Sequence, residues 1–284
     1  MRKWSIHLVL LATLGVFSGS ANAAYKEEYE EFEKGSVAYN KGDIATAINN
    51  WKAVALKGNL MAQLHLGQMY QMGDGGLVPI NLEEAAFWFR KAAEQGDESG
   101  QCFLAFMYKM GNGVPKDPAL AMYWFQKSAE QGSALAQREL VKIYMNGTGT
   151  PVDYTLALEW LRRVGMNQDD EAQVLVGQMY LEGKGTPKNI AEAVRWFCLA
   201  AEMRNGKAYY FLGRLYEQRE GVEKDDLLAY VFYRLAVNRN YFDAAVYRDA
   251  VAARLAPEQL KQGQKVIEDS HDGILFSVVL HRAK

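Results

Sequence analysis

Side chains able to carry catalysis or hold a metal are few in this 284-residue chain and follow no known spacing. Its two cysteines, Cys102 and Cys198, lie far apart, and of its histidines His65, His271 and His281 share no interval that suits a metal site. The chain contains no Ser-x-x-Lys, His-Glu-x-x-His, Cys-x-x-Cys or Gly-x-Ser-x-Gly motif. We therefore expect no enzyme activity, no cofactor and no metal. We interpret His65 as a core or groove-edge residue and both cysteines as buried apolar residues without a disulfide.

Two series of aromatic residues recur every 36 residues. The first series is Tyr108, Tyr144, Tyr180 and Tyr216. The second series is Trp88, Trp124, Trp160, Trp196 and Phe232. Such self-similarity at one period is the signature of a repeat protein. Because their phase is strict, we expect these rings, together with Tyr70, to form the core and not a surface for stacking sugars or bases.

Each repeat is predicted to be a pair of helices joined by a loop with two glycines. The first helix carries Ala, Leu, Gly and Tyr at offsets 0, 4, 5 and 8, which share one helical face. The first loop glycine suits a left-handed helix C-cap. These glycines are Gly73, Gly111, Gly147 and Gly183. The second helix centres on Ala-x-x-Trp. Neither helix can bury its apolar face alone, so the pairs must stack.

A glycine inside the first helix costs about 1 kcal/mol relative to alanine, so its recurrence needs a reason. It stands at Gly67, Gly177 and Gly213, with Ala105 and Val141 in the other two repeats. We expect a neighbouring helix to approach the backbone closely at this position.

The pattern Ala-x3-Leu-Gly-x2-Tyr-x2-Gly-x-Gly followed by Ala-x2-Trp-x3-Ala-Ala-x2-Gly, clearest at residues 172–206, resembles the Sel1-like repeat family. These are relatives of tetratricopeptide repeats. The resemblance implies an all-α fold, an α/α right-handed superhelix of stacked antiparallel helix pairs, and a role in binding proteins. Some cysteine-rich members are linked to penicillin binding and β-lactamase activity, but this chain lacks their regular cysteine spacing.

The chain is predicted to divide into a front cap, five repeats and a rear cap. A signal peptide covers residues 1–23, and a degenerate tetratricopeptide-like repeat covers 24–58. The five Sel1-like repeats cover 59–240, at about 59–96, 97–132, 133–168, 169–204 and 205–240. Helices near 243–255 and 257–269 cap the stack within 241–270. The tail 271–284 holds an apolar run, 274–280, that either docks on the last helix pair or remains exposed to bind a partner.

The N-terminus reads as an export signal. Arg2 and Lys3 precede a short apolar run at residues 8–17, and Ala21 and Ala23 fit an A-x-A cleavage site. The run is too short for a permanent membrane span. We expect cleavage after Ala23 and a periplasmic protein, or one released from the cell. With a net charge of −2 for the whole chain, neither nucleic acid nor an anionic membrane is an expected partner.

The partner surface is predicted from the related tetratricopeptide fold, in which the first helix of each pair lines a concave groove. Carried onto this chain, three positions per repeat face the groove. The candidate binding residues are Gln68, Gln71, Phe106, Lys109, Arg138, Lys142, Gln178, Tyr210 and Arg214, with Leu64, Cys102, Met145, Val174, Leu181 and Glu217 at the same phases. A basic centre at Lys109, Arg138 and Lys142 would suit a segment with acidic and apolar residues or a C-terminal carboxylate.

Three functions fit this sequence. The favoured one is a monomeric scaffold or adaptor that binds other proteins, with a regulatory or assembly role in the bacterial cell envelope. The second is a secreted factor that binds host proteins. The third is a β-lactamase-like or peptidoglycan-acting enzyme, which the absence of a serine nucleophile motif disfavours.

Overall fold

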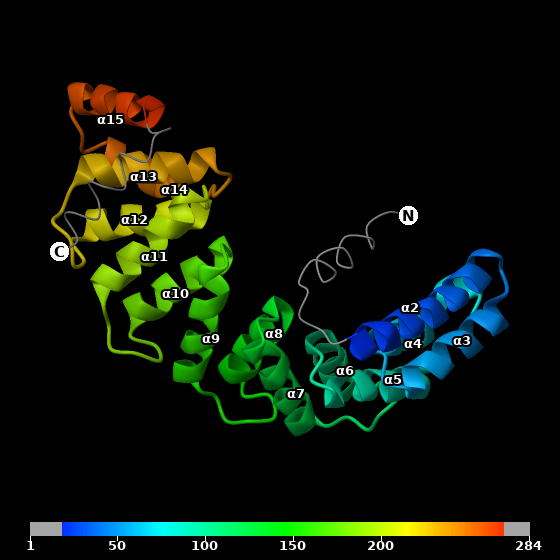
Figure 1. The fold of residues 1–284 in the computed structure, drawn as a ribbon. Helices are drawn as coiled ribbons and strands as arrows, with labels where there is room; N and C mark the ends of the chain where they lie inside the picture. The colour runs from blue at the N-terminus through cyan, green and yellow to red at the C-terminus, as the bar shows by residue number, and fades with distance from the viewer. Residues whose placement is uncertain (1–18, 270–284) are drawn as a thin grey trace. The chain divides into compact units, whose positions relative to one another are not determined.

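The structure, a computed structural model, describes residues 19–269, with side chains described for residues 29–268. This described part is all-helical, as expected, and contains no strand (Figure 1). Its helices are α2 Gly19–Asn40, α3 Ile44–Leu56, α4 Leu60–Met72, the 3-10 turn η1 Asp74–Gly76, α5 Leu82–Glu94, α6 Glu98–Met110, α7 Pro118–Glu130, α8 Ala134–Asn146, α9 Tyr154–Met166, α10 Asp170–Glu182, α11 Ile190–Glu202, α12 Gly206–Gln218, α13 Asp226–Asn238, α14 Ala244–Ala252 and α15 Pro257–Asp269.

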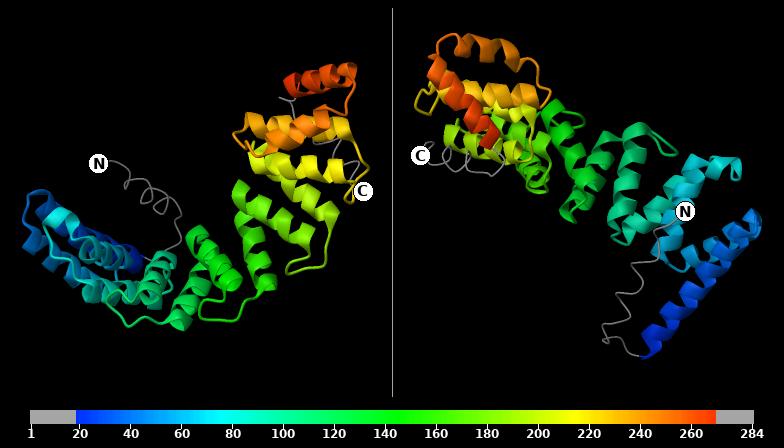
Figure 2. Two further views of the ribbon diagram at one scale, coloured as in Figure 1. Left: turned by 180° about the vertical axis from the view of Figure 1, so that it is seen from behind. Right: turned by 90° about the horizontal axis from the view of Figure 1, so that it is seen from above.

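The chain forms two compact units, residues 1–128 and 129–284. In the first unit α2 packs on α3, α4 on α5, and α5 on α6. In the second unit α8 packs on α9, α10 on α11, and α12 on α13 (Figure 2). Within each unit, helices that follow one another in sequence are neighbours in space, which is the stacking expected of repeats.

Asn, Asp or Ser precedes each of the ten repeat helices. Before the first helix of each pair stand Asn59, Asp97, Ser133, Asp169 and Asn205; before the second stand Asn81, Asp117, Asp153, Asn189 and Asp225. All except Ser133 accept a hydrogen bond from the backbone N–H three residues further on. These N-caps satisfy backbone donors that a helix leaves unpaired and so fix where each helix starts.

The predicted glycine C-caps are confirmed. Gly73, Gly111, Gly147 and Gly183 adopt φ between 70° and 76° at the ends of α4, α6, α8 and α10. The fifth repeat departs from this pattern, because Arg219 holds the left-handed position after α12 with φ 58°.

Replacing Arg219 with Gly is expected to stabilise the second unit by about 1 kcal/mol, because only glycine adopts this backbone region without steric cost. Thermal unfolding followed by circular dichroism measures the gain. The matched reverse change, Gly183→Arg, should lower stability by a similar amount. Equal melting temperatures for Arg219→Gly and the parent chain would contradict the prediction.

The glycine inside the first helix marks a close approach, as expected. A Cβ atom added to Gly67 would lie 2.5 Å from the ring of Phe89, and one added to Gly177 would lie 2.5 Å from the ring of Phe197. In the fifth repeat the same contact joins Gly213 to Tyr233, at 2.8 Å. Each missing side chain therefore makes room for an aromatic ring of the partner helix.

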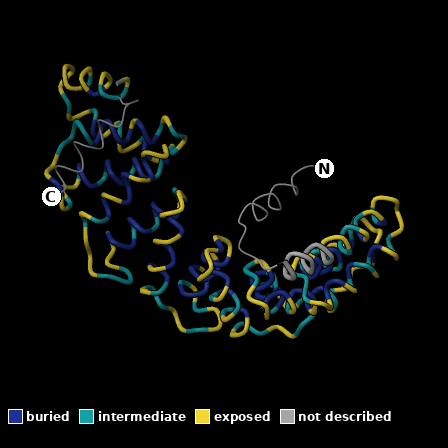
Figure 3. The backbone as a smooth tube through the Cα atoms, viewed as in Figure 1, coloured by how far each residue is buried: buried dark blue, intermediate teal, exposed yellow. Residues whose placement is uncertain are grey.

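Most of the repeating aromatic residues are core residues. Trp88, Trp160, Trp196, Phe232, Tyr144, Tyr180 and Tyr216 are buried. Figure 3 shows buried and exposed stretches alternating along the helices, as an amphipathic face requires. The expectation holds only in part for Trp124, Tyr70 and Tyr108, which are half-buried. Polar groups approach two of these rings: Lys52 lies over Tyr70, and Arg90 donates to the hydroxyl of Tyr108.

A ladder of buried glutamines joins each of the first four repeats to the helix before it. The side-chain amides donate to a backbone carbonyl eight residues earlier, near the end of the preceding helix. The pairs are Gln63 to Ala55, Gln101 to Ala93, Gln137 to Ala129 and Gln173 to Gly165, at 2.8–3.4 Å. In the fifth repeat Tyr209 takes the glutamine position. These bonds fix the register of one helix on the next, since a buried amide without partners is costly.

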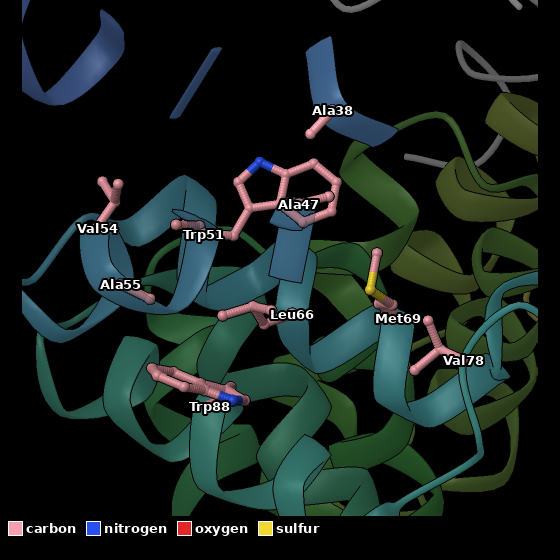
Figure 4. Packing of buried hydrophobic residues seen from close by; sticks show 10 residues of the cluster. Ala38, Ala47, Trp51, Val54, Ala55, Leu66, Met69, Val78 and Trp88 are labelled. Carbon is pink, nitrogen blue, oxygen red and sulfur yellow. The ribbon is translucent and has the colours of Figure 1, made fainter. Parts of the chain in front are cut away.

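The front cap is a helix pair, α2 and α3, whose centre is Trp51. Trp51 belongs to a buried apolar cluster that also contains residues of α4, of the following loop and of α5 (Figure 4). The indole N–H donates to the carbonyl of Phe32, and Gly35 leaves space for the ring. α2 starts at Gly19, before residue 24 where the front cap was predicted to begin, so it includes residues that we assigned to the signal peptide.

The rear cap consists of α14 and α15, close to the predicted ranges. Both pack against α13. Gly263 of α15 approaches Tyr230 and Leu227 of α13, where an added Cβ would lie 3.0–3.1 Å from their side chains. The apolar run 274–280, for which docking or exposure was expected, lies outside the described residues.

Candidate protein-binding surface

The predicted groove residues are partly exposed, with two exceptions. Cys102 and Val174 are buried, so the position two residues before the repeat Leu or Val does not face solvent in those repeats. The reason is that this position also borders the neighbouring helix, where a small apolar side chain packs. The remaining candidates keep part of their surface accessible.

The expected basic centre is largely neutralised within the chain. The guanidinium of Arg138 binds the carboxylate of Asp169, with Nη2 2.5 Å and Nε 3.0 Å from Oδ2. The amine of Lys142 lies 2.8 Å from a carboxylate oxygen of the buried Glu139. Both cations therefore have acidic partners before any ligand arrives, and neither offers an uncompensated charge.

In the first unit two of the candidate residues, Phe106 and Lys109 of α6, form a cation–π contact. The amine of Lys109 lies 5.7 Å from the ring centroid of Phe106, whose edge packs on Phe125. Gln68 and Gln71 are half-buried on α4. In the second unit Gln178 is half-buried on α10. We find no further grouping of these glutamines among the described residues.

The second unit brings four tyrosines together into what we call the tyrosine platform: Tyr210 of α12, Tyr233 of α13, Tyr241 of the following loop and Tyr247 of α14. The ring centroid of Tyr210 lies 5.1 Å from that of Tyr241, 5.4 Å from that of Tyr247 and 6.0 Å from that of Tyr233. Tyr233 is fully buried, whereas Tyr210 and Tyr241 are half-buried and Tyr247 is 39% exposed. The platform is therefore buried at its base and accessible at its edge.

An ionic network holds the base of the platform. The hydroxyl of Tyr233 donates to Glu217 at 2.7 Å, and Arg254 donates to the other oxygen of the same carboxylate at 2.9 Å. Burial and the neighbouring Glu217 carboxylate raise the pKa of Tyr233. Burial, with a hydrogen bond that Tyr210 donates to Tyr247, raises the pKa of Tyr210 to about 12. The phenols therefore stay neutral and can act as hydrogen-bond donors.

Arg214 is the cation at the edge of the platform. Its guanidinium carbon lies 5.9 Å from the ring centroid of Tyr210, and Nη2 donates to the amide oxygen of Gln218 at 3.3 Å. Within residues 29–268 no carboxylate forms an ion pair with Arg214, because its neighbour Glu217 is engaged by Tyr233 and Arg254. Arg214 thus offers the charge that Arg138 and Lys142 do not.

The structure therefore places two of the candidate binding residues, Tyr210 and Arg214, beside each other and adds residues that the sequence did not point to. Tyr241 and Tyr247 lie beyond the last repeat, where no period assigns a residue to a face. The sequence could have indicated Tyr233, since it directly follows Phe232 of the aromatic series. The corresponding positions in other repeats are Phe89, Phe125 and Phe197.

The residues first considered for chemistry have structural roles. His65 lies between aromatic rings, 4.2 Å from Trp51 between centroids, and burial lowers its pKa. Cys102 and Cys198 are buried and form no disulfide, and burial raises the pKa of Cys198 to about 12, which makes it a poor nucleophile. Across the described residues, no three His, Cys, Asp or Glu side chains gather as a metal site requires.

Comparison with solved structures finds helical repeat proteins. A protective antigen of uropathogenic Escherichia coli strains, displaying an SLR fold, is 29% identical with a TM-score of 0.67; the match covers 88% of this chain and 55% of the antigen. A Sel1 repeat protein from Oxalobacter formigenes is 31% identical with a TM-score of 0.59, covering 72% of this chain and 84% of that protein.

Among curated proteins, chitin synthase regulatory factor 3 of Schizosaccharomyces pombe is 42% identical over 60 residues, which is 21% of this chain and 6% of that protein. This chain thus spans a small part of the fungal factor and about half of the bacterial antigen. The Sel1 repeat model matches residues 60–97, 99–133, 134–165, 170–205 and 206–241, more than half of the chain. This chain belongs to the Sel1 repeat family.

Proposed function

We propose that this chain is an exported, non-enzymatic scaffold of the bacterial cell envelope that binds a partner protein at the tyrosine platform. One observation carries the proposal: Arg214, a cation without an acidic partner among the described residues, lies over Tyr210, whose ring packs against the partly exposed Tyr241 and Tyr247. Tyrosine and arginine are the residues most enriched where protein interfaces gain their affinity. Such a surface suits a segment that combines a carboxylate with apolar side chains.

The surface next to the platform is also suited to a partner. Phe242 and Val246 are 67% and 74% exposed. Apolar side chains grouped beside polar ones are typical of interaction sites. The partner would place its carboxylate on Arg214 and its apolar side chains on Tyr241, Tyr247 and these two residues.

Export is supported by the sequence of residues 1–23, and a partner would then be an envelope protein. Among the described helices, none has the length and apolar character that crossing a bilayer requires. The second candidate, a released factor that binds host proteins, is favoured by the likeness to the protective antigen of uropathogenic Escherichia coli.

Crosslinking in intact cells, followed by capture and mass spectrometry, tests the function. We expect one partner whose recovery falls about tenfold, or about 1.4 kcal/mol, in Arg214→Glu and in Tyr247→Ser. The captured chain should start at residue 24. Arg162→Glu is the matched control, because Arg162 is exposed in the same unit and away from the platform.

Circular dichroism must show that the variants fold like the parent chain. Recovery that is the same for Arg214→Glu and Arg162→Glu would rule out the platform as the binding site. Recovery of the chain from the culture medium alone would replace the envelope scaffold by the released factor.

A further inference from the structure

We propose that residues 272–276 of this chain occupy the tyrosine platform in cis and compete with the partner there. This inference rests on the proposed function, since it names a ligand for the same surface. The segment is Asp272, Gly273, Ile274, Leu275 and Phe276. It lies outside the described residues, and its place is argued from the chemistry of its sequence and from what surrounds the platform.

Chain connectivity allows this segment to reach the platform. α15 packs on α13 through Gly263, which approaches Tyr230. Tyr233 of the platform lies on the same helix, three residues from Tyr230, a rise of about 4.5 Å along the axis. A chain of seven residues, the number from 270 to 276, can span at most about 25 Å. α13 therefore carries both the attachment of the segment and the base of the platform.

The chemistry of the segment complements that of the platform. Asp272 supplies the carboxylate that Arg214 lacks among the described residues, and a carboxylate on a guanidinium forms a strong charge-assisted hydrogen bond. Ile274 and Phe276 follow at alternate positions, so in an extended segment they point to the same side. They match the exposed edge formed by Tyr247, Val246 and Phe242.

Attachment to the same chain gives the segment an effective concentration in the millimolar range. A weak contact would then cover the apolar edge whenever no partner is bound. A partner would have to displace the segment, so only a partner that binds the platform more tightly than the tethered segment would be bound.

A disulfide-trapping experiment on the full-length chain tests this inference. Val246→Cys, on an exposed position beside Tyr247, is combined with Leu275→Cys, and disulfide formation under mild oxidation is followed by peptide mass spectrometry. The native cysteines are buried and do not interfere. The matched control pairs Leu275→Cys with Val152→Cys, which is 48% exposed in the same unit. We expect an intramolecular disulfide that forms about tenfold faster at position 246 than at position 152.

A charge exchange tests the pairing of Asp272 with Arg214. Arg214→Glu should slow trapping at position 246, and Asp272→Lys in the same chain should restore it; Arg162→Glu should not slow it. Equal rates at positions 246 and 152, disulfides only between chains, or no restoration would each overturn the inference. Partner capture is measured separately. Capture without trapping therefore overturns only this inference, and trapping without capture overturns only the proposed function.

Discussion

Replacing Gly177 with Val should destabilise the fourth repeat by about 3 kcal/mol. The new Cβ would lie 2.5 Å from the ring of Phe197, a fully buried side chain that is stacked on Phe211 and has no space to move. Overpacking of this kind costs about 1–3 kcal/mol, more where the neighbour is held. Urea unfolding monitored by circular dichroism measures the change.

The third repeat of the same chain shows how the loss can be recovered. There Val141 stands at the position of Gly177, and Leu161 stands at the position of Phe197. Adding Phe197→Leu to Gly177→Val should therefore restore at least about 1 kcal/mol, although Phe197→Leu alone leaves a cavity and destabilises. If the double variant instead loses the sum of the two single-variant stability losses, the side chains at positions 177 and 197 do not compete for the same space.

Replacing Trp160 with Ala should cost about 3–5 kcal/mol, because it removes one of the largest buried side chains of the second unit. It also removes the surface under Arg163, whose guanidinium carbon lies 4.4 Å from the ring centroid. Repeat arrays can unfold in parts. Global unfolding measures the total loss of stability, and amide hydrogen exchange should show that protection is lost mainly in α8 to α11.

Glu159→Ala is the matched control for Trp160→Ala, since Glu159 is the exposed neighbour on the same helix. It should change stability by less than about 0.5 kcal/mol. An unchanged unfolding curve for Trp160→Ala, together with lost partner binding, would mean that the ring belongs to a binding surface and not to the core.

The fold was predictable because its determinants are local and recur. A glycine such as Gly177 or Gly183 is required by a single contact or a single backbone angle, and the same requirement returns 36 residues later. Trp124 shows the limit of this reasoning. It occupies the same repeat position as the buried tryptophans but is half-buried. The repeat position determines which face of the helix a side chain lies on, but not how completely neighbouring residues cover that side chain.

The binding surface was harder to predict, because it depends on pairings between side chains that lie far apart in sequence. Arg138 meets Asp169, 31 residues later, since Asp169 is fixed in space as the N-cap of α10. Recognising the recurrent N-caps would have exposed that pairing. Tyr241 and Tyr247 lie outside the period, so only the packing of α14 on α13 brings them to Tyr210.

The glutamine ladder limits how an array like this can lengthen by gene duplication. A copied first, second or third repeat brings both the amide that reaches back and the carbonyl that receives the next amide. A copied fifth repeat would bring Tyr209 in place of that amide, so the carbonyl before it would receive no glutamine side chain. New repeats should therefore arise from the first three repeats, while the fifth repeat, which carries Tyr210 and Tyr233 of the tyrosine platform, stays single and last.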